Sequence, residues 1–480
     1  MVQDLLSYTE QTDFTKQKMR FSLNEFFDVC QIVYLCKMFR DCLYPNSCFK
    51  EMNVLLRFTI ENFRSIAERK SIILTPTAIK DQPHSNIAKI DKIDYLRTIA
   101  IYGANSSGKS NLIQGLECME KLLLNSVKIN DDDKLLYDPY RLNTSKENTP
   151  TLYEIVFVTN NLRYRYGFSN TDKRIHDEWL IQVESSGNES KLFVRTVEGI
   201  GINEELFPEG KELESKTNDN RLFLSVVGQL GGEISKSVIR FFQQGFNVLS
   251  GLDTESYEPF TKIFLDQKLP GCDAMKQFFL RVQLGFKDVL SFAHKFDIND
   301  LPEQLPKDLK ERLAKDLDGK KKLKIVSSHG VYDDEGNMIE TKDFDFDKME
   351  SAGTRKLFDL AGPIFDTLHS GKVLVIDELD AKMHPLISQE LVKLFNDPTR
   401  NPHGAQLIFT THDTNLLSSH LLRRDQIWFT EKDEQERTDI YNMMQIVLPD
   451  GTKPRGDGNI ERNYIRGRYG AIPYISPYAK

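Results

Sequence analysis

The residues best suited to chemistry in this sequence form a glycine-rich loop. Eight consecutive residues fit the pattern G-x-x-x-x-G-K-[ST]: Gly103, Ala104, Asn105, Ser106, Ser107, Gly108, Lys109 and Ser110. Glycines at these positions let successive backbone N–H groups face one anion, and the N-terminus of a following helix adds its positive dipole end. Lys109 is suited to the outer phosphates of a nucleotide such as ATP, and Ser110 to Mg²⁺. The pattern predicts a phosphate-binding loop; the alternative is an ordinary Gly/Ser turn.

The sequence on either side of the loop favours the phosphate-binding interpretation. Residues 99–102 are an apolar run typical of a buried strand. After the loop, apolar residues recur at helical spacing, at Leu112, Ile113, Leu116 and Met119. A strand, the loop and a helix in this order are the context that the pattern requires.

Two further apolar strands end in residues that could complete a nucleotide site. Residues 372–376 lead into Asp377 and Glu378. Asp377 could hold Mg²⁺ through water, and Glu378 could orient the attacking water. Residues 406–411 lead into His412, which could sense the γ-phosphate, although a lone histidine at a strand end is more often structural.

A second group of phosphate-binding donors is expected near residue 351. Ser351, Gly353 and Thr354 form a Ser-x-Gly-Thr turn, and the residues after it have helical periodicity. Because one ATP needs only one phosphate loop, a second set of N–H donors suggests a site that another subunit completes.

Composition limits the classes of function. The 480 residues are 40% hydrophobic and 28% charged, with a net charge of −8, so the chain is long enough for two or three domains and is not a protein that coats nucleic acid electrostatically. A local basic patch remains possible at Lys320, Lys321, Lys322 and Lys324. We find no apolar run long enough to span a bilayer and no signal pattern, and therefore expect a cytoplasmic protein with no membrane partner.

The cysteines do not favour a metal site. Two of them are expected to be buried free thiols, Cys118 and Cys272, as in a reducing compartment. Four others are spaced by six residues, whereas zinc sites use pairs separated by two to four: Cys30, Cys36, Cys42 and Cys48.

Changes of pattern along the chain predict an α/β organisation in four parts. Residues 1–51 differ in composition, because they are rich in Cys and Phe, and are either an appended helical piece or the result of a start codon chosen in error. Residues 52–208 carry the phosphate loop and an antiparallel β-meander with hairpins near Asn160-Asn161 and residues 186–188. Residues 209–322 have helical periodicity and predict a helical insertion, and residues 323–480 return to strands and carry the remaining motifs.

The order of these motifs resembles that of ABC-type ATPases: phosphate loop, Ser-x-Gly signature, strand ending in Asp-Glu (Walker B), D-loop and switch histidine. The long insertion resembles the SMC, RecF and OLD-like branch rather than transporters. Within that branch, five segments are similar to the RloA/AbiLi-like ATPases of bacterial restriction and abortive-infection loci: Asn62-Phe-Arg-Ser, Ser351-Ala-Gly-Thr-Arg-Lys-Leu, Asp377-Glu-Leu-Asp-Ala-Lys-Met-His-Pro385, Asp425-Gln-Ile-Trp-Phe and Gly467-Arg-Tyr-Gly-Ala-Ile-Pro473. The resemblance runs from Met52 to Pro473.

The resemblance implies a P-loop NTPase fold of the ABC head type, in which a mixed sheet flanked by helices is joined to an antiparallel β-subdomain. It also implies roles for single residues. Lys109 would contact the β- and γ-phosphates, Ser110 and Asp377 would surround Mg²⁺, Glu378 would be the catalytic base and His412 the switch histidine. Arg64 would contact nucleotide. Ser351, Gly353 and Thr354 would serve the partner's nucleotide, and residues 380–384 would form the D-loop across the dimer. The glutamine of the Q-loop has no assigned position.

The function implied is an ATP-hydrolysing dimeric switch in bacterial anti-phage defence. Because the residues after His412 carry no nuclease-like cluster, the effector, a nuclease, would be encoded separately. The main alternative is a RecF- or SMC-like ATPase that binds DNA in repair or maintenance, against which the acidic composition counts modestly. A transporter subunit is disfavoured by the long insertion, and an inactive scaffold by the presence of Glu378.

Overall fold

A seven-stranded sheet is formed mainly by the first third of the described chain. The computed structural model describes residues 53–473 except 82, 296–320, 419 and 457, so the predicted extension over residues 1–51 and Lys320 lie outside the described residues. Every neighbouring pair in this sheet is antiparallel, and the strand order is β10-β9-β8-β7-β6-β1-β2. The strands are β1 (Val54–Glu61), β2 (Lys70–Ile73), β6 (Thr151–Thr159), β7 (Leu162–Asn170), β8 (Ile175–Val183), β9 (Glu189–Thr196) and β10 (Gly199–Ile202).

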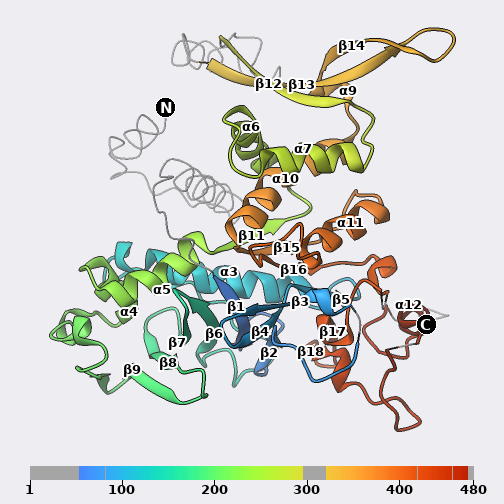
Figure 1. Ribbon diagram of the computed structural model, residues 1–480. Helices are drawn as coiled ribbons and strands as arrows, with labels where there is room; N and C mark the ends of the chain where they lie inside the picture. The colour runs from blue at the N-terminus through green and yellow to red at the C-terminus, as the bar shows by residue number, and fades with distance from the viewer. Residues whose placement is uncertain (1–52, 82, 296–320, 419, 457, 474–480) are drawn as a thin grey trace. The chain divides into compact units, whose positions relative to one another are not determined.

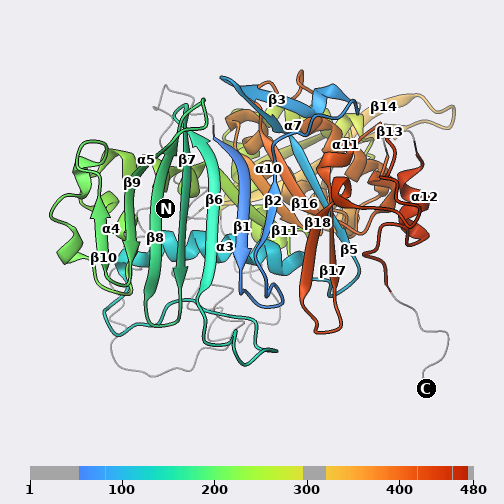
Figure 2. The same ribbon diagram turned by 90° about the horizontal axis from the view of Figure 1, so that it is seen from below.

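The predicted hairpin at residues 160–161 is confirmed. β6 and β7 pair with Thr159 opposite Leu162, and the two residues between them, Asn160 and Asn161, have φ values of 50° and 60°. A two-residue turn with both φ angles positive matches the right-handed twist of the strands, and asparagine tolerates this conformation. The predicted meander is therefore correct, but it is part of a larger sheet that also includes β1 and β2 (Figure 2).

A second, six-stranded sheet carries the candidate site. Its order is β11-β15-β16-β5-β17-β18, in which the first five strands are parallel and the edge strand β18 is antiparallel. The strands are β5 (Thr98–Gly103), β11 (Phe246–Ser250), β15 (Val373–Asp377), β16 (Gln406–Thr410), β17 (Ile427–Lys432) and β18 (Thr438–Asn442). Because parallel strands end at the same edge of a sheet, the residues that follow β5, β15 and β16 lie close together.

Helices cover both faces of this sheet. α3 (Lys109–Asn125) contacts β5 and β15 on one side and β1 and β6 on the other, so it lies between the two sheets. One hydrophobic core joins both sheets through this helix. Figure 1 shows α10 (Ala352–Ser370) and α11 (Pro385–Asn396) on the opposite face of the six-stranded sheet. The fold is therefore an α/β P-loop architecture with an antiparallel β-subdomain, as predicted.

The predicted helical insertion contains more than helices. Helices α4 (Phe223–Gln229) and α5 (Glu233–Gln244), separated near Gly231-Gly232, follow the periodicity, and α6 (Glu258–Asp266) and α7 (Cys272–Arg281) come later. Between them, however, β11 is an edge strand of the six-stranded sheet, paired in parallel with β15. Describing residues 209–322 as helical is wrong at this point. β11 is only five residues long (Phe-Asn-Val-Leu-Ser) and begins two residues after α5 ends, so periodicity cannot distinguish it from a continuation of the helix.

The remaining elements are smaller. A three-stranded antiparallel sheet consists of β12 (Asp288–Lys295), β13 (Lys321–Tyr332) and β14 (Met338–Asp345), followed by the short helix α9 (Phe346–Met349). β3 (Ile87–Ile90) and β4 (Ile93–Leu96) form a hairpin, and α12 (Ile460–Ile465) lies near the C-terminus. Cys118 and Cys272 are free thiols as expected; Cys272 is buried and Cys118 is half-buried. Over the described residues, no helix has the length and apolar character needed to cross a membrane.

Candidate nucleotide-binding site

The glycine-rich loop connects β5 to α3 as predicted. Gly108 precedes the first helical residue and has a φ of 106°, in the left-handed region that favours glycine. A Cβ at this position would also clash with the side chain of Thr438. Both the backbone conformation and the close packing therefore require glycine here, which is the reason the pattern could be recognised in the sequence.

Two threonines of the β17–β18 hairpin form hydrogen bonds with Ser107 of the loop. Ser107 is hydrogen-bonded through its hydroxyl to Thr430 Oγ1 at 2.6 Å. Thr438 Oγ1 donates to the Ser107 carbonyl at 2.9 Å. These contacts fix the loop against a strand pair more than 300 residues away in sequence, and no local pattern predicted them.

Lys109 is held inside the loop. Its side-chain Nζ donates to the carbonyls of Gly103 and Ala104 at 2.9 and 3.0 Å, and the residue is only 5% exposed. Burial lowers the pKa of Lys109, while the carboxylates at and just after the end of β15, Asp377, Glu378 and Asp380, act in the opposite direction. A cation with little water around it is therefore placed beside several anions.

The two acidic residues at the end of β15 are fixed by one hydroxyl. Thr410, at the end of the neighbouring β16, donates from Oγ1 to Asp377 Oδ1 at 2.6 Å and accepts from the backbone N–H of Glu378 at 2.7 Å. Glu378 has a φ of 56°, an unusual value for a residue with a side chain. On the other side of β15, Gly251 approaches so closely that a Cβ there would clash with the Glu378 carbonyl. These contacts therefore fix the Asp377 carboxylate and the part of the backbone from which the Glu378 side chain extends.

A pocket of about 530 Å³ brings the loop and these strand ends together. Its lining includes six loop residues, the predicted Glu378 and His412, and two residues that the sequence did not single out, Asn111 and Lys432. The loop residues are Asn105, Ser106, Ser107, Gly108, Lys109 and Ser110.

His412 is one of the residues that line this pocket. Its side chain is exposed, and its backbone N–H donates to Asp380 Oδ2 at 3.3 Å. Desolvation and the nearby Lys109 cation lower the pKa of the imidazole. The neutral form is therefore favoured at neutral pH, so one ring nitrogen can accept and the other can donate a hydrogen bond.

Comparison with protein families gives one match that covers most of the chain. Residues 99–418 match the family described as "AAA domain, putative AbiEii toxin, Type IV TA system". The chain belongs to this AAA-domain family. A comparison with curated proteins gives no significant match.

Solved structures similar to this AAA-domain protein include heads of SMC proteins and RecF. The SMC head domain from Thermotoga maritima is 12% identical with a TM-score of 0.37, over 81% of this chain and 98% of that one. The Smc head domain from Pyrococcus furiosus is 11% identical with a TM-score of 0.34, over 81% and 96%. The recombination mediator protein RecF is 11% identical with a TM-score of 0.32, over 81% and 98%.

Two other predicted site residues of the AAA-domain protein, Arg64 and Ser351, are not among the residues that line the pocket. Arg64 does not line it; its side chain donates to Asp138 Oδ2 at 2.9 Å and to Gln114 of α3. The Ser351 turn opens α10 as predicted, because Ser351 Oγ accepts from the Thr354 N–H at 3.2 Å, but the turn is not part of the lining either. A role for Ser351 at a nucleotide would therefore concern a nucleotide held elsewhere.

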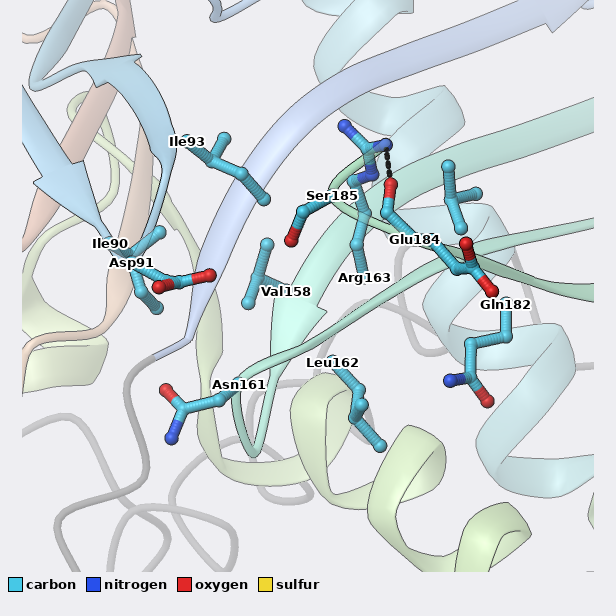
Figure 3. A pocket seen from close by; sticks show the side chains of 11 residues that line it. Ile90, Asp91, Ile93, Val158, Asn161, Leu162, Arg163, Gln182, Glu184 and Ser185 are labelled. Atoms are coloured by element: carbon cyan, nitrogen blue, oxygen red, sulfur yellow. Dashed lines mark hydrogen bonds between the residues drawn. The ribbon is translucent and has the colours of Figure 1, made fainter. Parts of the chain in front are cut away.

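Figure 3 shows a second pocket, of about 290 Å³, that has no part in this site. It lies between the β3–β4 turn and the ends of β6, β7 and β8, and Arg163 on its wall donates to the Glu184 carbonyl at 2.6 Å. None of its lining residues belongs to the glycine-rich loop or follows β15 or β16.

The donor set near the loop fits Mg²⁺ bound together with phosphate. The described residues contain no group of three or more His, Cys, Asp or Glu side chains arranged to hold a metal ion alone. Mg²⁺ commonly takes one or two carboxylates and completes its coordination with phosphate oxygens and water. Ser110 and Asp377 would be its protein ligands, and the bound ion would neutralise phosphate charge.

Proposed function

We propose that this chain is an ATP-binding and ATP-hydrolysing switch that works as a dimer. The observation that carries the proposal is the convergence of the glycine-rich loop, Glu378 and His412 on one pocket at the ends of parallel strands. A structural Gly/Ser turn would not require a buried lysine, a glutamate with a strained backbone and a histidine around the same pocket.

Each residue contributes a different interaction in this proposal. The loop N–H groups and Lys109 bind the phosphates, while Ser110 and Asp377 hold Mg²⁺. Glu378 orients the attacking water and accepts its proton, and Thr410 fixes the position from which it does so. His412 contacts the γ-phosphate through a neutral imidazole.

The dimer is supported by the position of the Ser351 turn. Ser351 is exposed and begins a helix of 19 residues, so it offers backbone N–H groups and a helix dipole to an anion. It does not line the pocket of its own chain. A second copy of this chain, facing the first, would bring Ser351, Gly353 and Thr354 to the nucleotide of its partner.

The biological setting we propose is defence against phage by abortive infection. It rests on the resemblance of the motifs to the RloA/AbiLi-like ATPases and on the family description, which names an AbiEii toxin of a type IV toxin–antitoxin system. In this proposal the ATPase is the sensor in the cytoplasm and controls a nuclease encoded separately. DNA binding is less favoured because the chain has a net charge of −8, and Lys324 of the basic run is paired with Asp345 at 2.8 Å.

ATP turnover by the purified chain, with and without duplex DNA, tests the proposal. Glu378→Gln is the control without hydrolysis, and it should accumulate an ATP-bound dimer detectable by mass photometry. Absence of turnover in the wild type, or equal turnover in Glu378→Gln, would overturn the enzymatic assignment. Strong stimulation of ATP turnover by DNA would favour the RecF-like alternative. ATP turnover that is the same with and without DNA would support a switch that responds to a protein.

A further inference from the structure

Lys356 is a buried cation in the helix that begins at Ser351. The residue is only 4% exposed, and its Nζ donates to the carbonyl of Ala381. Lysine is rarely buried to this extent unless it is paired. Within the part of the chain that the structure describes, Lys356 has no carboxylate at ion-pair distance, and its hydrogen-bond partner is a backbone carbonyl in the turn after β15.

That turn contacts the start of α10 at a second point. A Cβ on Gly353 would lie 3.1 Å from the Lys382 carbonyl, so the two backbones are close. Lys382, like Glu378, has a positive φ, 57° and 56° respectively. A turn with two strained residues needs contacts that hold it in place, and Lys356 supplies one of them.

The same turn leads directly to the proposed catalytic base. Ala381 accepts from Lys356 through its carbonyl and donates from its N–H to the Glu378 carbonyl at 3.2 Å. One residue therefore connects the lysine of α10 with the backbone of Glu378. Asp380, beside it, accepts from the His412 N–H through Oδ2, while its Oδ1 is buried without a hydrogen-bond partner.

We infer that Lys356 is a positioning residue for Glu378, which holds the turn of residues 378–382 against the start of α10 and so links the Ser351 motif to the hydrolytic carboxylate of the same chain. This inference rests on the proposed ATPase function. It assigns a route by which an anion arriving at Ser351 would affect hydrolysis at the pocket of its own chain, in addition to the pocket of its partner.

The charge of Lys356 offers a direct way to examine this role. Burial lowers the pKa of Lys356 to about 8; Asp380 and Glu378 act against that shift, and Lys382 adds to it. The ammonium therefore loses its proton as pH rises through about 8, and a neutral amine is a weaker donor to the Ala381 carbonyl. Arginine at the same position would stay charged, because its pKa lies above 12.

The experiment compares Lys356→Met and Lys356→Arg with a matched control, Lys372→Met. Lys372 lies just after the far end of α10, is 12% exposed and is paired with Asp366 at 2.9 Å, so it tests loss of a similarly buried lysine away from the pocket. We expect Lys356→Met to lower kcat at least tenfold, with the Kd for a non-hydrolysable ATP analogue changed less than threefold. Lys356→Arg should restore most of kcat and remove the fall of kcat above about pH 8.

Several results would overturn the inference. If kcat in Lys356→Met matches that of Lys372→Met, Lys356 does not position the base. If Lys356→Arg keeps the alkaline fall of kcat, the fall belongs to another group such as Lys109, and the assignment to Lys356 is wrong. Should Lys356→Met fail to fold, the comparison of the wild type with Lys356→Arg across pH still decides. A wild type without ATP turnover would instead overturn the proposed function.

Discussion

Removing the hydroxyl of Thr410 should slow ATP hydrolysis without weakening ATP binding. Thr410 is fully buried, and its Oγ1 bridges the Asp377 carboxylate and the Glu378 N–H. Thr410→Val keeps the shape of the side chain and its packing, but it leaves both groups without this partner. The change therefore isolates the positioning of the two carboxylates from the packing of β16.

The magnitude follows from the two hydrogen bonds. A hydrogen bond to a charged group contributes about 1.5–3 kcal/mol, and a neutral one about 0.5–1.5 kcal/mol. Asp377 and Glu378 are half-buried, so water can hydrogen-bond to them and offset part of the lost free energy. Glu378 also has a strained φ of 56°, which costs on the order of 1 kcal/mol to maintain. If about 1.4–2.8 kcal/mol is lost from the transition state, kcat falls about 10- to 100-fold.

Thr410→Ser is the matched control. Serine keeps the hydroxyl and loses one buried methyl group, so we expect a loss of roughly 1 kcal/mol in the free energy of unfolding, with kcat within about threefold of the wild type. Steady-state ATP turnover and urea unfolding of both variants separate the two effects. The reasoning is refuted if kcat of Thr410→Val stays within about threefold of the wild type, or if both variants lose kcat equally.

Three further predictions concern binding, assembly and pH. Lys109→Ala should weaken ATP binding at least about 100-fold in calorimetry, since the residue supplies the cation of the loop; retained affinity would contradict the phosphate-loop assignment. Ser351→Arg, introduced into Glu378→Gln, should abolish the ATP-dependent dimer while one chain still binds ATP, and a dimer in mass photometry would count against the proposed contact. Burial raises the pKa of Asp359 to about 7, so the folded state binds this proton more tightly than the unfolded chain and loses stability as pH rises from about 4 to about 7. Asp359→Asn should therefore be more stable than the wild type by about 1–3 kcal/mol at pH 8 and nearly equal at pH 4 in urea unfolding; equal stability at both pH values would show that the carboxyl titrates normally.

Features that depend on a few neighbouring residues could be predicted from the sequence alone. The glycine-rich loop requires a positive φ at Gly108, and the hairpin requires the same of Asn160 and Asn161. The start of α10 depends on the hydroxyl of Ser351 three residues before the N–H that it caps. In each case the residue type and the conformation are linked within a few positions, so the pattern in the sequence is enough to identify the element.

The tertiary structure decided which distant residues meet. β11 could be recognised as a strand only by its pairing with β15, because a segment of five residues is too short to show a period that separates a strand from a helix. The resemblance implies that Arg64 contacts nucleotide, and only the structure shows that its side chain donates to Asp138 and Gln114. A resemblance predicts the type of residue at a position, whereas the partner depends on packing.

The supports of the site were invisible in the sequence for the same reason. Thr410 is 33 residues from Asp377, Lys356 is 25 residues from Ala381, and Thr438 is 331 residues from Ser107. A threonine or a lysine has no distinctive spacing, and many occur along the chain. The sequence by itself determined the local chemistry of the loop and the strand ends. Only the folded structure decided which hydroxyl meets Asp377 and which lysine meets the Ala381 carbonyl, because side-chain hydrogen bonds act over about 3 Å in space regardless of separation along the chain.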